Sequence, residues 1–162
     1  MFINKKILIL LVLINIATMG FLFKNVQETK WLNKVTENSI MNRIESISSE
    51  IERFDKERPN VRISYVREEC STLLANLETY RWLERRGNSG ELEYLFLKFR
   101  RVIDKNDAII GTDITDEMME TLNLINHYIE EFQQCEGKNL KEKLKKFNEI
   151  VANDGTYFDL RR

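Results

Sequence analysis

The chain has a single histidine, His127, whose setting limits the metal chemistry that the sequence could support. At 100° per residue, His127 lies opposite the apolar stripe of its expected helix, and Glu131 follows four residues later on the same face. This pair could supply two ligands to a weak metal site or form an exposed ion pair. Because one histidine is too few for most histidine-based sites, we expect the ion pair, with no metal and no cofactor.

The serine and cysteine residues lack the setting that nucleophilic catalysis needs. Asn88, Ser89 and Gly90 predict a turn, but not the strand-to-helix elbow that exposes a nucleophile. There is no glycine-rich phosphate loop and no paired-cysteine motif. Adjacent carboxylates such as Glu130 and Glu131 point about 100° apart on a helix, which is typical of a solvated face. We therefore predict that the protein is not an enzyme.

The elements that position these residues are separated by the helix-breaking residues. Apart from Gly20, the one proline and six glycines fall between segments of 3.6-residue periodicity, at Pro59, Gly87, Gly90, Gly111, Gly137 and Gly155. The predicted fold is all-α. It comprises a leader and transmembrane anchor over 1–23, a stalk helix over 24–58 that continues into the bundle, an antiparallel bundle of about four to five helices over 59–155, and a tail over 156–162.

An uncharged run from Ile7 to Phe23 predicts the single transmembrane helix. Lys5 and Lys6 precede the run and Lys24 follows it. Its 17 residues are at the low end of the length that spans a hydrocarbon core of about 30 Å. A cleaved signal peptide is the alternative, but the run continues past its few small residues, so we expect an uncleaved signal anchor.

The short basic leader favours a single-pass orientation in the cytoplasmic membrane, with the N-terminus on the cytoplasmic side and the helical domain outside the cytoplasm. The lysines near the two ends of the run are nearly balanced, so the alternative is the reverse orientation. Beyond residue 23 the chain has 23 basic and 26 acidic side chains, a net charge of −3. This balance argues against nucleic acid as a partner.

Apolar stripes predict the core of the bundle. In the first helix they run with coiled-coil-like spacing, and because nothing breaks the pattern after Phe23, we expect one helix from about Lys5 to Glu57. The predicted inward positions are Ile40, Ile44, Ile47, Ile51 and Phe54; Ile63, Val66, Cys70, Leu73, Leu77 and Tyr80; Leu92, Leu95, Phe96, Phe99, Val102 and Ile103; Met118, Leu122, Ile125, Ile129 and Phe132; and Leu140, Leu144, Phe147 and Val151. Asn139 with Glu142 predicts a capping box for the last helix.

Cys70 and Cys135 are expected to be free thiols. If the second and fourth helices run the same way, the two cysteines lie near opposite ends of the bundle, roughly 20 Å apart along the axis. A disulfide needs Cα atoms within about 7 Å of each other.

Trp82 is the best candidate for binding a partner. It lies roughly 140° from the core stripe of its helix. Tryptophan and arginine are the residues most enriched at binding hot spots. We therefore predict a partner-binding patch of Trp82, Arg81, Arg85, Arg86, Tyr94 and Leu97. The alternative is that another helix of the bundle covers Trp82.

Within the anchor, Asn15, Thr18 and Gly20 predict a face for association with another membrane helix, because polar and small residues promote such packing. The alternative is that these residues face lipid. A cluster of lysines on the last helix could meet anionic lipid or an acidic partner, or simply form a solvated face.

The sequence therefore predicts a non-enzymatic, membrane-anchored accessory or assembly subunit of a membrane or cell-envelope complex. Its predicted partners are the bilayer and another membrane or envelope protein, or a second copy of the chain. The alternative function is a regulatory or ligand-sensing bundle that works through a separate membrane partner, and a buried polar pocket would favour that alternative. A small hydrolase is the least favoured function.

Overall fold

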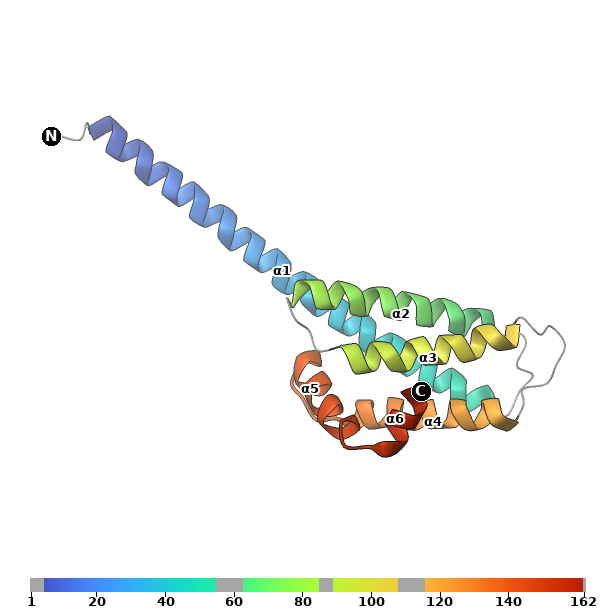
Figure 1. Cartoon of the computed structure of the whole chain (residues 1–162). Helices are drawn as coiled ribbons and strands as arrows, with labels where there is room; N and C mark the ends of the chain where they lie inside the picture. Colours follow the sequence, from blue (N-terminus) through green and yellow to red (C-terminus); the bar gives the residue numbers. More distant parts are fainter. Residues whose placement is uncertain (1–4, 55–62, 85–88, 108–115, 162) are drawn as a thin grey trace. The chain divides into compact units, whose positions relative to one another are not determined.

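The computed structural model describes residues 5–54, 63–84, 89–107 and 116–161, with side chains left out at 5–10, at 158 and at a few helix ends. All elements in these ranges are helices, as predicted (Figure 1). They are α1 (Lys5–Phe54), α2 (Ile63–Leu83), α3 (Gly90–Asp107), α4 (Asp116–Gln134), α5 (Leu140–Val151) and α6 (Gly155–Arg161).

The chain divides into two compact units, Met1–Val35 and Thr36–Arg162. The boundary falls inside α1, which is one continuous helix as expected from the unbroken sequence pattern. The predicted continuation from Asp55 to Glu57, with Pro59, lies outside the described residues. We call Thr36–Arg162 the bundle and describe each unit by itself.

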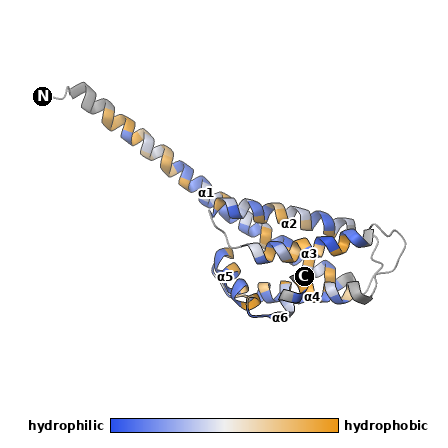
Figure 2. Ribbon diagram, in the orientation of Figure 1, coloured by the Kyte–Doolittle hydropathy of each residue, from blue (hydrophilic) through white to orange (hydrophobic). Residues whose placement is uncertain are grey.

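In the first unit, the side chains of α1 from Leu11 to Phe23 are all exposed, and most of them are apolar. In Figure 2 this part of the ribbon is predominantly orange. Among the residues that the structure describes, no helix has a stretch long and apolar enough to cross a membrane. The first side chains of the predicted run, at positions 7–10, lie outside the described part.

In the bundle, α2, α3 and α4 alternate in direction (Figure 1). Ion pairs fix the antiparallel register of α2 and α3 near both ends of their contact: Arg67 Nε lies 2.9 Å from Asp104 Oδ1, and Arg81 Nη1 lies 3.2 Å from Glu93 Oε2. In α1, Arg43 lies 2.8 Å from Glu69 of α2. Because α2, α3 and α4 alternate in direction, the second and fourth helices run the same way, as expected.

The predicted apolar stripes form one core. The residues predicted to face inward are buried wherever their side chains are described, except Val102, which is only partly buried. Phe54, Ile63 and Met118 lie outside the described side chains. Burial of these stripes is the main stabilising contribution to a bundle of this kind.

The predicted capping box begins α5. Asn139 has an extended backbone, and its side-chain oxygen accepts a hydrogen bond of 3.0 Å from the Glu142 backbone N–H. The Glu142 carboxylate accepts in return from the N–H of Lys138, at 2.9 Å, one residue earlier than in the usual box. The bonds thereby satisfy the Glu142 N–H, which the first turn of the helix leaves unpaired, and the N–H of Lys138 just before the cap.

The predicted tail is instead helix α6, and it belongs to the core. Asp154 caps it by accepting the Thr156 N–H at 2.8 Å, while its other oxygen accepts the Tyr128 hydroxyl at 2.8 Å. Tyr157 and Leu160 are buried. The Tyr157 hydroxyl donates to the Glu91 carbonyl of α3 at 2.7 Å, so α6 closes one side of the bundle.

Candidate functional site

Among the bundle side chains that the structure describes, Trp82 is the most exposed large apolar one, with 76% of its surface accessible. Its neighbour Arg81 pairs with Glu93 of α3, and Glu93 also accepts a hydrogen bond from the Ser89 hydroxyl at the start of α3. The alternative that another helix covers Trp82 therefore does not apply within the described bundle. The polar groups beside Trp82 are held in place, while the indole itself faces outward.

The other residues of the predicted patch divide into three groups. Leu97 is exposed, one turn beyond Glu93 on the same side of α3, so it stands near the ion pair that flanks Trp82. Tyr94 is half-buried, and its hydroxyl donates to the Leu160 carbonyl of α6 at 3.5 Å. Arg85 and Arg86 lie outside the described residues. Trp82 and Leu97 are thus the outward apolar members.

The polar residues of the predicted anchor face are satisfied by their own helix. The Asn15 amide donates to the Leu11 carbonyl at 2.9 Å, and the Thr18 hydroxyl donates to the Ile14 carbonyl at 2.8 Å. A Cβ atom added at Gly20 would meet nothing within 4 Å. Two polar groups of the predicted anchor are therefore already paired within their own helix.

Both cysteines are free thiols, as predicted. Cys70 is in the core near the start of α2, where its thiol donates to the Phe96 carbonyl at 3.3 Å. Burial raises the pKa of Cys70 to about 12, so the thiol is protonated at neutral pH. Burial also raises the pKa of Cys135. Neither thiol has the lowered pKa that marks a reactive cysteine.

His127 is exposed on α4, and its ring packs against Tyr128 with centroids 5.3 Å apart. Within the described residues, no group of three or more His, Cys, Asp or Glu side chains is arranged to hold a metal ion. The lysines of α5 are mostly engaged, since Lys141, Lys145 and Lys146 pair with carboxylates and Lys143 donates to the Gln133 carbonyl at 2.9 Å.

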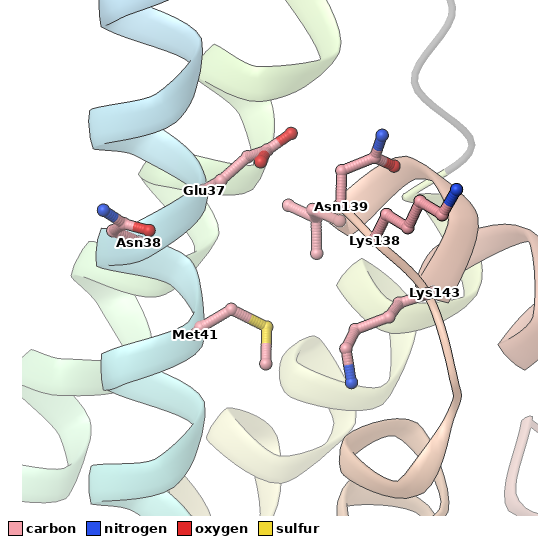
Figure 3. A pocket seen from close by; sticks show the side chains of 8 residues that line it. Glu37, Asn38, Met41, Lys138, Asn139 and Lys143 are labelled. Carbon is pink, nitrogen blue, oxygen red and sulfur yellow. The ribbon is translucent and has the colours of Figure 1, made fainter.

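A small cleft of about 180 Å³ lies between α1 and the segment that begins α5. Its lining residues are Glu37, Asn38, Met41, Gly137, Lys138, Asn139, Leu140 and Lys143. Figure 3 shows Glu37 and Met41 on one side and Lys138, Asn139 and Lys143 on the other. Gly137 is required here by space, because an added Cβ would come within 2.9 Å of the Lys143 nitrogen.

Glu37 connects α1 to the start of α5. Its carboxylate accepts a hydrogen bond from the Leu140 backbone N–H, one of the donors that a helix leaves unpaired in its first turn. Burial, and then the negative charge of Glu84, raise the pKa of Glu37, while the hydrogen bond from Leu140 and the nearby Tyr80 hydroxyl lower it. Burial and the Glu84 charge have the larger effect on the pKa. The ionised form of Glu37 is therefore less favourable in the folded protein than in water.

Tyr80 of α2 and Glu84, which directly follows α2, complete this cluster. The Tyr80 hydroxyl is buried and lies by the Glu37 carboxylate without good hydrogen-bond geometry, and burial followed by the two carboxylate charges raises its pKa. Glu84 pairs with Lys141 of α5 at 3.2 Å. Three helices therefore meet through these polar side chains, an arrangement that sequence periodicity did not predict.

Glu37→Gln is expected to be as stable as the wild type or more stable at neutral pH. The glutamine oxygen can still accept from Leu140 and avoids the cost of a partly buried charge. A carboxyl whose folded pKa is raised contributes most when protonated, and the contribution is lost as the pH rises through the folded pKa. The advantage of glutamine should therefore shrink as the pH falls. Urea unfolding of both full-length chains in detergent, at neutral and acidic pH, measures it.

Glu37→Ala is the matched control, because it removes the acceptor as well as the charge. We expect it to cost about 1–3 kcal/mol, the usual penalty for a backbone donor left without its partner. If the glutamine and alanine variants lose the same stability at neutral pH, the assigned role of the Leu140 hydrogen bond is wrong.

Comparison with known proteins provides no relative for this chain. No protein-family model matches it, and neither the curated proteins nor the solved structures include a significant match.

Proposed function

We propose that the protein is a non-enzymatic accessory or assembly subunit of a membrane or cell-envelope complex. In this proposal, Ile7 to Phe23 form a single transmembrane helix, and the bundle binds another envelope protein outside the cytoplasm. The observation that carries the binding role is the exposed indole of Trp82 beside the Arg81–Glu93 ion pair. An exposed tryptophan next to fixed polar groups has the composition of a binding hot spot.

The proposed membrane anchor rests on the sequence. The run from Ile7 to Phe23 is 17 residues long and carries no charged side chain. Asn15 and Thr18, the polar residues of the run, donate to carbonyls of their own helix. Such pairing reduces the cost of placing them in hydrocarbon. Lys5 and Lys6, which directly precede the run, support an N-terminus on the cytoplasmic side.

A binding role agrees with the use of the unusual polar groups in the bundle. Glu37 and Tyr80 have raised pKa values because they are buried between helices, and Asp154 has a lowered pKa because it accepts the Tyr128 hydroxyl and caps α6. Each of these groups has a structural role in joining helices. Their perturbed pKa values are therefore accounted for without catalysis.

Trp82→Ala is expected to weaken partner binding by about 2 kcal/mol, roughly a thirtyfold loss of affinity. Its effect on stability should be within about 0.5 kcal/mol, because the indole is exposed. Affinity purification of the tagged full-length chain in mild detergent, followed by quantitative mass spectrometry, measures the co-purifying proteins. Thermal unfolding of the same samples measures stability.

Ile150→Ala is the control, since Ile150 is also exposed, with 42% of its surface accessible, but lies on α5. A protein recovered in constant ratio with the wild type and with Ile150→Ala, but lost with Trp82→Ala, would support the proposal. Equal recovery with all three chains would refute the role of Trp82. Recovery of the chain alone would indicate self-association instead of an accessory role.

The second candidate is a ligand-sensing bundle, and the cleft between α1 and α5 is the observation that favours it. Glu37, Lys138 and Lys143 give the cleft both signs of charge. Its volume of about 180 Å³ is below the range of about 300–1,000 Å³ usual for small-molecule sites. We therefore place the sensing role second.

A further inference from the structure

Three consecutive residues of the first unit, Lys30, Trp31 and Leu32, are exposed shortly after the apolar run ends. The Trp31 indole has 64% of its surface accessible, and Leu32 has 44%. Lys34 is exposed one turn after Lys30. Consecutive helical residues point about 100° apart, so residues 30–32 surround much of the helix instead of forming one stripe.

The distance along α1 places this segment close to the membrane surface. Trp31 lies eight residues beyond Phe23, about 12 Å along the helix axis. The apolar run is only about 25 Å long, so a hydrocarbon core of about 30 Å draws part of the flanking turn inward. Each headgroup layer adds about 5–8 Å. The Trp31 backbone therefore lies near the outer edge of that layer.

The direction of the side chain brings the indole closer still. On a helix, each Cα–Cβ bond tilts toward the N-terminus, so a long side chain covers the turn before its own Cα. For Trp31, that turn is the one nearer the apolar run. Tryptophan, with an apolar ring and one N–H donor, is enriched at this depth of membranes.

The charges favour lipid as the occupant. Lys24 is paired with Glu28, at 3.7 Å, and this pair leaves the exposed ammonium groups of Lys30 and Lys34 on either side of the Trp31 position in sequence. Lysines beside a membrane helix are attracted to anionic headgroups. A partner helix would contact a single stripe, whereas a headgroup layer surrounds the helix and contacts every face.

We propose that Lys30, Trp31, Leu32 and Lys34 form a collar that binds the anionic headgroup layer of the membrane in which the chain is anchored. The collar sets the depth at which α1 leaves the bilayer. This inference rests on the proposed membrane anchor. It adds a second, interfacial contact to the apolar run and assigns that contact to phospholipid phosphates.

The test uses the two tryptophans of the chain as separate reporters. The full-length Trp82→Phe variant, in which Trp31 is the only tryptophan, is reconstituted into vesicles of equal parts phosphatidylcholine and phosphatidylglycerol. The fluorescence emission of Trp31 should be blue-shifted relative to that of Trp82, which the Trp31→Phe variant reports. Lipids brominated near the headgroup should quench Trp31 several-fold more than they quench Trp82. Iodide in the aqueous phase should instead quench Trp82 more than Trp31.

A Lys30→Glu and Lys34→Glu double change in the Trp82→Phe background tests the charges. Quenching by brominated lipid should fall in vesicles with phosphatidylglycerol and change little in vesicles of phosphatidylcholine alone. If the emission of Trp31 matches that of Trp82 in both quenchers, the collar does not exist. A blue-shifted Trp31 that brominated lipid does not quench would show that protein covers it, which also overturns the inference.

Flotation of the same vesicles separates this inference from the proposed function. A chain that does not float with the vesicles contradicts the membrane anchor itself. A chain that floats but whose Trp31 remains open to iodide contradicts the collar alone.

Discussion

Phe147→Ala is expected to destabilise the bundle by about 3–5 kcal/mol, a large part of the stability of a typical domain. Phe147 of α5 is fully buried and makes edge-to-face contacts with Phe132 of α4 and Tyr157 of α6, with ring centroids 5.6 and 6.3 Å apart. Removing the ring leaves a cavity where three helices meet. The melting temperature should fall by on the order of 10 °C. Circular dichroism of the full-length chain in detergent measures this change.

Ile150→Ala provides the comparison on the same helix. Ile150 is exposed, so truncating it should cost less than about 1 kcal/mol. The effect of helix propensity is similar for the two substitutions, and the difference between them therefore reports burial. If the two variants melt at the same temperature, α5 is not packed as described.

The helices and most of the core could be predicted because periodicity is a direct record of burial. Ile40, Ile44 and Ile47 alternate by four and three residues, and all three are fully buried. The capping box of Asn139 and Glu142 was likewise visible, since it depends on residues three apart. These features depend on local sequence, which is why they needed no knowledge of tertiary contacts.

Helix α6 was missed because it is only seven residues long and has only one apolar pair at helical spacing. Tyr157 and Leu160 are three residues apart, and Asp154 is a suitable cap two residues before Thr156. These signals were present in the sequence. What fixes the helix is tertiary, namely the hydrogen bonds of Asp154 with Tyr128 and of Tyr157 with Glu91.

The cluster around Glu37 could not be predicted from periodicity. Glu37 lies three residues before Ile40, at the edge of the core stripe, and its role depends on where the start of α5 meets α1. Sequence patterns assign residues to faces, but they do not specify which helix ends meet. In the same way, the exposure of Trp82 followed from its angular position, whereas the engagement of Tyr94 with α6 did not.

Two arginines in the apolar run are expected to abolish membrane anchoring. In the Leu13→Arg and Ile16→Arg double variant, each charge placed near the centre of a transmembrane helix costs about 2.5–3.5 kcal/mol. The combined cost is large for a run of only 17 residues. Ile150→Arg is the control, because it adds a charge at an exposed position of the bundle. Immunoblots of membrane and supernatant fractions from cells that produce each chain measure the distribution.

Alkaline carbonate extraction of those membranes tests the central claim most directly, because it removes peripheral proteins and leaves proteins with a transmembrane helix in the bilayer. The wild type and Ile150→Arg should remain in the membrane pellet, and the double-arginine variant should be found in the supernatant. Release of the wild-type chain by carbonate would contradict the claim that Ile7 to Phe23 anchor this helical bundle in a membrane.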